Sequence, residues 1–259
     1  IVMKFDSTIN APRAEKIPYQ LKTHGDIRLD NYYWIKEKEN PEVIDYLERE
    51  NDYYQRMTKS SKSLKGDLFI EMKKRIKEED ESVPYFLNGF WYITRYEKGK
   101  QYPIYTRKKD SLTANEEILF DCNKLAKGHD YFQLVGVNVS PDNTKVIYGI
   151  DLESRRKYTL YVKDLLTNEV LKTNIKNTTG STAWSSNNKN FFYVKKNEQT
   201  LRPEKVFLHD ISKPENLDTL IYNEKDETFS VYINESKSKE YIFLSSYSTL
   251  TSEYQFIKS

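Results

Sequence analysis

Early in the chain, apolar side chains recur every three or four residues, which predicts two amphipathic helices. Asn40 followed by Pro41 is typical of a helix start, with asparagine as the N-cap and proline in the first turn. The second helix is expected to begin near Ser61 or Ser63. The apolar positions are Val43, Leu47, Tyr54 and Met57 in the first helix, widened by Ile44 and Tyr46, and Leu64, Leu68, Met72 and Ile76 in the second. We therefore interpret residues 1–80 as an N-terminal extension with two helices.

Beyond Val83 the apolar positions alternate with polar ones, a period that predicts β-strands. The first expected strands are FWYITRYE (90–97), PIYTRKK (103–109) and EILFDC (117–122). The same alternation returns in VSPDNTKVIYGID (139–151), YTLYVKDLLTNEVL (158–171), WSSNNKNFFYVKK (184–196), KVFLHDIS (205–212), DTLIYN (218–223), INESKSKEYIFLSS (233–246) and SEYQFI (252–257). Short strands separated by polar turns thus fill the rest of the chain.

These strands repeat in a fixed order of turn, apolar strand, hairpin and outer strand. Aligning Trp91, Val146, Phe191 and Tyr241 gives intervals of 55, 45 and 50 residues. Four short strands in about 40–50 residues are typical of a β-propeller blade, although a β-sandwich would also show regular short strands. We predict a mainly β fold in which residues 81–259 form the N-terminal part of a propeller. About four blades fit, and the last repeat lacks an outer strand, so the chain is expected to be truncated.

Composition adds little to this picture. The 259 residues carry 41 basic and 39 acidic side chains, and a formal charge of +2 favours neither nucleic acid nor a membrane as a partner. There is one cysteine, so no internal disulfide can form. No apolar run is long enough to span a bilayer, and the first residues lack the pattern of a signal peptide. We expect a cytoplasmic protein, or a periplasmic one if a leader has been removed.

The chain shows no local signature of covalent or metal chemistry. Its eight glycines are never four residues apart, which excludes a Gly-x-Ser-x-Gly nucleophile elbow within this sequence. The histidines at 24, 129 and 209 are far apart, and Cys122 has no signature of a nucleophile. We therefore expect no cofactor and no metal, and we predict no catalytic residue in this chain.

One stretch is unlike the rest. HGDIRLDNYYWIK (24–36), with NPEVIDYLERENDYY (40–54) after it, resembles the opening segment of the oligopeptidase B (protease II) branch of the prolyl oligopeptidase family of serine peptidases. SVPYFLNGFWYITRYEKGKQYPIYTRKK (82–109) is similar to the first propeller strands of that family, and VSPDNTKVIYGID is similar to the next blade. The resemblance extends over nearly the whole chain from Ala11. Prolyl oligopeptidase itself usually has Asp-Pro-Tyr where this chain has Asp30-Asn31-Tyr32, so the resemblance favours the oligopeptidase B branch.

The resemblance implies an architecture and an activity. In this family a helical extension packs on a C-terminal α/β-hydrolase domain, and a seven-bladed propeller caps the active site and admits only short peptides. Oligopeptidase B cleaves after Lys or Arg with a Ser-His-Asp site, which here would lie beyond Ser259. The implied partners are short basic peptides, as substrates of the full-length protein, and its own hydrolase domain. The chain alone is expected to be inactive.

Within the resembling stretch we predict structural roles. Asp26, Arg28 and Asp30 are expected to form ion pairs or caps at the domain junction. Tyr33 and Trp34 are expected to bury against the hydrolase domain. Replacing a buried tryptophan by alanine costs about 3–5 kcal/mol.

Two other functions are alternatives to the enzyme. One is a propeller-type module that binds peptides or proteins without catalysis. The other is nucleic-acid binding through the lysine-rich second helix, which the acidic residues after the lysines make a weak hypothesis. A Gly-x-Ser-x-Gly motif and a late histidine beyond residue 259 would distinguish the enzyme from the binding module.

Overall fold

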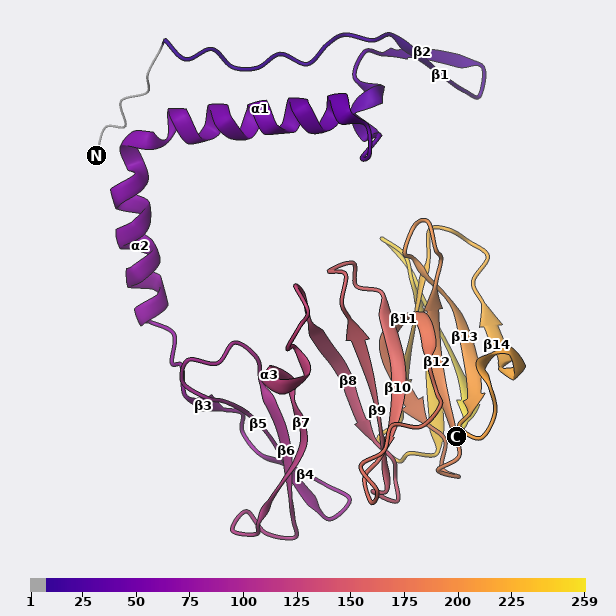
Figure 1. Ribbon diagram of the computed structural model, residues 1–259. Helices are drawn as coiled ribbons and strands as arrows, with labels where there is room; N and C mark the ends of the chain where they lie inside the picture. The colour runs from indigo at the N-terminus through magenta and orange to yellow at the C-terminus, as the bar shows by residue number, and fades with distance from the viewer. Residues whose placement is uncertain (1–7) are drawn as a thin grey trace. The chain divides into compact units, whose positions relative to one another are not determined.

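The computed structural model describes residues 8–259 and divides the chain into two units. The first unit ends at Lys77, and the second runs from Glu78 to Ser259 (Figure 1). Among the described residues, no helix combines the length and the apolar composition that crossing a bilayer requires.

The first unit contains a hairpin and two main helices. Its elements are β1 (Tyr19–Thr23), β2 (Asp26–Asp30), η1 (Tyr33–Lys36), α1 (Pro41–Met57), η2 (Lys59–Ser61) and α2 (Lys62–Lys74). The strands β1 and β2 pair antiparallel across a turn made by His24 and Gly25, which both have positive φ angles, 51° and 83°. Two consecutive positive φ angles suit the twist of a two-residue hairpin. The sequence patterns above do not indicate this hairpin.

The predicted helix starts are confirmed. The Asn40 side chain accepts a hydrogen bond from the Glu42 backbone N–H (2.9 Å), and Pro41 is the first residue of α1. The second helix, α2, begins directly after Ser61 but ends at Lys74, so Ile76 lies outside it. Val43 is the one buried apolar side chain among the described residues of this unit. Most of both apolar stripes is therefore exposed to solvent.

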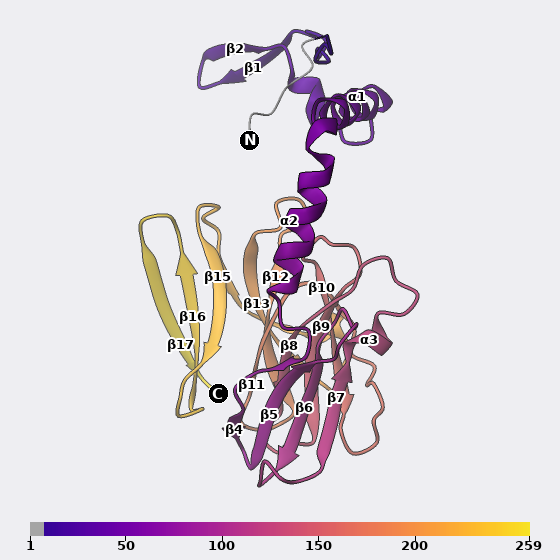
Figure 2. The ribbon, with the colours of Figure 1, turned by 90° about the vertical axis from the view of Figure 1, so that its left-hand side faces the viewer.

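The second unit consists of β-sheets, which confirms the mainly β prediction (Figure 2). The first sheet contains β3 (Asp80–Glu81), β4 (Tyr85–Leu87), β5 (Phe90–Tyr96), β6 (Ile104–Lys109) and β7 (Glu116–Asp121). A seven-stranded sheet contains β8 (Gln133–Val139), β9 (Lys145–Asp151), β10 (Tyr158–Asp164), β11 (Ile175–Trp184), β12 (Asn190–Lys196), β13 (Pro203–Asp210) and β14 (Thr219–Asn223), with η3 (Glu215–Leu217) before β14. The third sheet contains β15 (Ser230–Glu235), β16 (Tyr241–Tyr247) and β17 (Ser252–Lys258).

The predicted strand EILFDC ends one residue early. Cys122 is the first residue of a short helix, α3 (Cys122–Leu125), and not the end of β7. The reason is Asp121, whose carboxylate accepts hydrogen bonds from the backbone N–H groups of Asn123 and Lys124. A carboxylate in that position caps a helix and ends the strand.

The aligned positions of the repeat fall on equivalent strands. Trp91, Val146, Phe191 and Tyr241 lie on β5, β9, β12 and β16. The last three strands come after the same serine turn, in which the serine N–H donates to the carbonyl five residues on. The pairs are Ser140 to Lys145 (2.9 Å), Ser185 to Asn190 (2.9 Å) and Ser236 to Tyr241 (2.8 Å). The repeat in the sequence is therefore a repeat in backbone geometry.

One strand belongs to two successive sets of strands. Ile175, at the start of β11, lies opposite Leu160 of β10, whereas Trp184, at its end, lies opposite Phe191 of β12. The change of partner occurs around Gly180, which has a φ angle of +82°. This bend explains why two four-stranded groups appear as a single seven-stranded sheet.

Two backbones touch at this bend. A Cβ atom on Gly136 of β8 would lie 2.0 Å from the carbonyl oxygen of Gly180. Only glycine permits so close an approach.

Three apolar cores lie in the second unit. One lies between the first sheet and β8–β10, one surrounds Trp184 and Phe191, and one lies between β11–β13 and the third sheet.

Candidate functional site

The predicted junction residues lie on or just after the hairpin of the first unit. Asp26 and Arg28 are exposed on β2 and form no ion pair with another residue of the range 8–259. Asp30 accepts a hydrogen bond from the Tyr32 backbone N–H (2.9 Å). The structure therefore gives these three side chains one local hydrogen bond, and the ion pairs or caps expected for them at the domain junction stay a prediction.

The two aromatic residues of the same stretch pack within their own unit. Tyr33 stacks on Tyr19 with ring centroids 4.2 Å apart. The indole N–H of Trp34 donates to the carbonyl of Glu15 (3.0 Å), and its ring meets Tyr46 edge-on. Both side chains are half-buried. Through these contacts, η1 holds the segment before β1, the hairpin and α1 together.

The histidines are far apart in the chain, and the one cysteine is buried. His24 lies in the hairpin turn, and His129 is exposed on a loop. Burial, and secondarily the nearby Asp121 charge, raises the pKa of the Cys122 thiol to about 12, so the thiol stays protonated at neutral pH. No group of three His, Cys, Asp or Glu side chains that could hold a metal ion occurs in the described part of the chain.

His209 is the exception, because it belongs to a buried polar network. Its Nδ1 lies 2.7 Å from an Asp218 oxygen, and the other oxygen of that carboxylate accepts the Tyr193 hydroxyl (2.8 Å). The Thr173 hydroxyl lies 3.5 Å from Nε2. Burial and the Asp218 carboxylate both raise the pKa of Tyr193. His209 and Asp218 are almost fully buried, so the network anchors β12, β13 and the start of β14 and does not meet a substrate.

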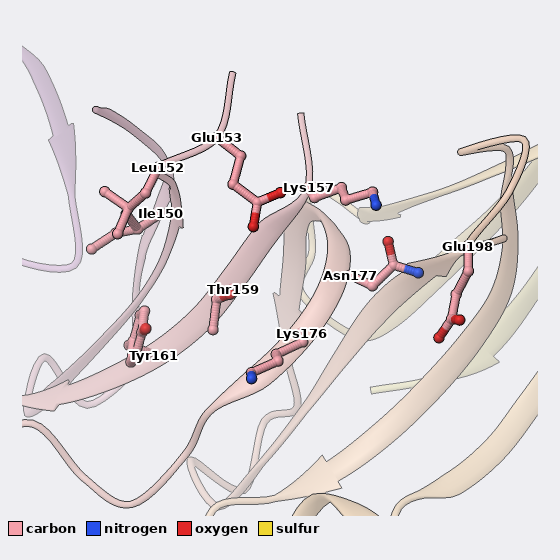
Figure 3. A pocket seen from close by; sticks show the side chains of 9 residues that line it. All are labelled: Ile150, Leu152, Glu153, Lys157, Thr159, Tyr161, Lys176, Asn177 and Glu198. Carbon is pink, nitrogen blue, oxygen red and sulfur yellow. The ribbon is translucent and has the colours of Figure 1, made fainter. Parts of the chain in front are cut away.

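A pocket with a volume of about 520 Å³ lies on β10 and the loop before it, and charged, polar and apolar side chains line it (Figure 3). Such a volume is within the range of small-ligand sites. Its lining residues are Ile150, Leu152, Glu153, Lys157, Thr159, Tyr161, Lys176, Asn177 and Glu198. Figure 3 shows Ile150, Leu152 and Tyr161 at one end, and Asn177 and Glu198 at the other. The pocket thus has an apolar end and a polar end.

A buried carboxylate holds the loop that forms one wall. Asp151 is 1% exposed, and its two oxygens accept the backbone N–H groups of Glu153 (2.8 Å) and Arg156 (2.7 Å). Within this loop Ser154 and Arg156 have positive φ angles of 58° and 55°. Non-glycine residues adopt that conformation only when their surroundings enforce it. The wall is therefore a fixed part of the fold.

Two carboxylates and two ammonium groups face this pocket, from Glu153, Glu198, Lys157 and Lys176. Within residues 8–259 none of these side chains forms an ion pair or a hydrogen bond. The Oδ1 atom of Asn177 is buried and also lacks a partner, while its Nδ2 donates to the Lys196 carbonyl (2.8 Å). The arrangement can bind a charged ligand, but it offers no activated nucleophile.

Sequence analysis did not identify these pocket residues, because exposed glutamates and lysines look like ordinary solvated positions. One signal was present: Glu153 and Glu198 are 45 residues apart, the same interval that separates Val146 from Phe191. Equivalent positions of successive repeats lie side by side when repeats stack.

The chain matches the family model of the prolyl oligopeptidase N-terminal beta-propeller domain over residues 12–258. It is 35% identical over 253 residues to Protease 2 of Moraxella lacunata, an alignment that covers 95% of this chain and 36% of the relative. It is also 35% identical over 260 residues to Dipeptidyl aminopeptidase BI of Pseudoxanthomonas mexicana, covering 93% of this chain and 36% of that relative. The chain thus spans little more than a third of the length of these proteins.

Solved structures give the same picture. Oligopeptidase B from Leishmania major superposes with a TM-score of 0.88 at 27% identity, covering 96% of this chain and 38% of that chain. Oligopeptidase B from Trypanosoma brucei, determined with covalently bound antipain in a closed form, gives a TM-score of 0.86 at 28% identity, covering 96% and 37%. The similarity includes the described part of the first unit as well as the sheets.

Proposed function

The chain belongs to the prolyl oligopeptidase family, and on that premise we propose that it is the N-terminal and propeller part of a serine oligopeptidase that hydrolyses short peptides after Lys or Arg. The observation that carries this proposal is the similarity to Protease 2 and to oligopeptidase B over nearly the whole chain. The proposed reaction uses a Ser-His-Asp site in a hydrolase domain. In this proposal that domain and the remaining blades of a seven-bladed propeller occupy the part of the relatives that this chain does not span.

The role of the sheets in this proposal is to control access. Stacked blades around a central channel exclude folded proteins and admit short, unstructured peptides.

The role of the first unit is to dock on the hydrolase domain. Its apolar side chains are largely exposed, including Leu68, Phe69 and Met72 of α2. Clusters of exposed large apolar side chains often mark a surface that another part of a protein covers. Asp26 and Arg28, which have no ion-pair partner among the described residues, would then pair across the junction.

The proposal is tested with the full-length protein that contains this chain. We expect hydrolysis of an N-blocked arginyl or lysyl p-nitroanilide, and at least about hundredfold slower hydrolysis of the matched alanyl and glutamyl compounds. Losing the charge-assisted hydrogen bonds to a buried basic side chain costs about 3 kcal/mol or more, which is a factor of this size. Equal rates on all four substrates would refute the specificity, and no hydrolysis of any would leave the peptide-binding module as the better description.

Dipeptide release is a second candidate, because Dipeptidyl aminopeptidase BI is as similar to this chain as Protease 2 is. An enzyme that removes dipeptides must recognise a free amino terminus. We therefore compare a dipeptidyl p-nitroanilide that has a free amino group with the same compound blocked by an acyl group. Faster hydrolysis of the blocked compound supports the oligopeptidase, and activity restricted to the free amine supports the aminopeptidase.

A further inference from the structure

Some charged side chains on these sheets form ion pairs. Arg95 binds Glu116 (3.0 Å), Arg107 binds Glu117 (2.8 Å), and Lys195 binds Glu215 (2.6 Å). The two glutamates and two lysines of the pocket in Figure 3 form no ion pair within residues 8–259. Groups of both signs surround one cavity and remain available to a ligand.

The unpaired atoms define what the ligand must carry. The carboxylates of Glu153 and Glu198 are acceptors, so the ligand must bring N–H donors. The ammonium groups of Lys157 and Lys176 require an anion. A ligand that has both a guanidinium or ammonium group and a carboxylate meets these requirements.

The other end of the pocket adds an apolar requirement. Ile150, Leu152 and Tyr161 lie away from Asn177 and Glu198 (Figure 3). They would cover a hydrophobic or aromatic side chain next to the charged groups of the ligand. A free amino acid of the basic type would leave this end empty, whereas a short peptide would fill it.

We infer that this pocket is a binding site for a short peptide that has a free carboxylate and a basic side chain, separate from the place where peptide bonds are cleaved. Glu198 receives the basic side chain, Lys176 receives the carboxylate, and the apolar end receives a neighbouring residue. The preference for a basic over an acidic side chain rests partly on the proposed function, because cleavage after Lys or Arg yields peptides with such an end. The pocket would thus retain products, or recruit peptides, on the propeller.

The inference is tested by photo-crosslinking on the full-length protein. The probe is benzoylphenylalanyl-glycyl-arginine with free amino and carboxyl ends, which has no bond after a basic residue to cleave. We expect the cross-link, mapped by mass spectrometry, on residues 150–161 or 176–177. The double variant Glu153→Gln/Glu198→Gln should lower the yield there at least about tenfold, since it removes both carboxylates that accept the ligand's N–H groups.

Matched controls separate this site from general charge effects. The double variant Lys237→Gln/Glu240→Gln changes exposed charges in the turn between β15 and β16 and should leave the yield unchanged. Lys176→Gln should lower the yield with the free carboxylate probe but not with its C-terminal amide. Cross-links that map outside both expected segments, or a cross-linking yield that is the same in all the pocket variants as in the unaltered protein, would overturn the inference.

Two further measurements, a competition experiment and a hydrolysis assay, identify the ligand. Free arginine should compete at least about tenfold less well than Phe-Gly-Arg, because it lacks the apolar group; equal competition would overturn the peptide assignment. Hydrolysis of the blocked arginyl p-nitroanilide is measured on the same samples. Cross-linking without hydrolysis would support the pocket and refute the proposed function, whereas hydrolysis without cross-linking would do the reverse.

Discussion

The two units of this chain are stabilised in different ways. In the second unit, large side chains such as Trp184 and Phe191 are at most 2% exposed and pack between sheets. In the first unit, the side chains are held by an N-cap, a stacked tyrosine pair and single hydrogen bonds, while Ile76 and Phe69 are 68% and 64% exposed. Apolar residues therefore build a core in one region and stay exposed on the surface of another.

The largest expected effect contrasts two tryptophans. Trp184→Ala empties a buried site and removes the indole bond to the Asn138 carbonyl (2.9 Å), so we expect a loss of about 3–5 kcal/mol in the free energy of unfolding. Trp34→Ala removes mainly local contacts and should cost about 1–2 kcal/mol if the first unit stands alone. Urea unfolding of the full-length protein measures both. A Trp34→Ala cost close to that of Trp184→Ala would support docking on the hydrolase domain, and an unaltered stability would refute the predicted burial.

A smaller effect concerns the contact between Gly136 and Gly180. Gly136→Ala should cost about 3 kcal/mol, because the new methyl group meets the Gly180 carbonyl and the φ angle of +64° is strained for alanine. Gly99→Ala is the matched control, since its φ angle is +71° but no atom lies within 4 Å of the added Cβ. It should cost about 1 kcal/mol. Equal losses in thermal unfolding would show that β8 and β11 separate easily at this point.

Alkaline pH should weaken the second unit. Burial raises the pKa of Cys122 from 9.0 to about 12, so the folded state keeps a proton that the unfolded chain releases. Stability is then complete below pH 9 and falls as the pH rises toward 12, by about 2 kcal/mol at pH 10.5. Denaturation at pH 8 and at pH 10.5 tests this. Cys122→Ala should remove only part of the difference, because burial also raises the pKa of Tyr148 to about 12 and raises that of Tyr193.

The smallest effect lies in the first unit. Asn40→Ala removes the hydrogen bond to the Glu42 N–H and should cost about 1 kcal/mol of α1 stability. Helix content measured by circular dichroism during unfolding reports it, and Asn40→Ser should restore most of the loss because serine also caps helices. A loss several times larger would mean that α1 supports contacts beyond its own unit.

Sequence patterns predicted the strands that follow a serine turn better than they predicted β11. Strands such as β9 and β12 combine an apolar stretch with a preceding serine turn, and their repeat is recognisable in the sequence. Strand β11 was missed over most of its length, because IKNTTGSTAW is mostly small and polar. Its conformation depends on tertiary contacts with β8, β10 and β12, which no local pattern contains.

The candidate site was less predictable than the fold. Residues 24–36 are unlike the rest of the chain in composition, yet the structure places Asp26 and Arg28 on an exposed strand. The pocket gathers Glu153, Lys176 and Glu198 from three different segments of the chain. Each is unremarkable in its own neighbourhood, and only the stacking of repeats brings them together.

Strand β11, which pairs with two successive groups of strands, limits how the gene for this protein can be rearranged. A blade that ends in a loop can be duplicated, deleted or permuted by cutting that loop, as between Leu125 and Gln133. A cut at Gly180 would instead divide β11 and remove the outer edge of one blade and the inner edge of the next. A rearrangement that keeps β11 whole must therefore move the strands on both sides of Gly180 together.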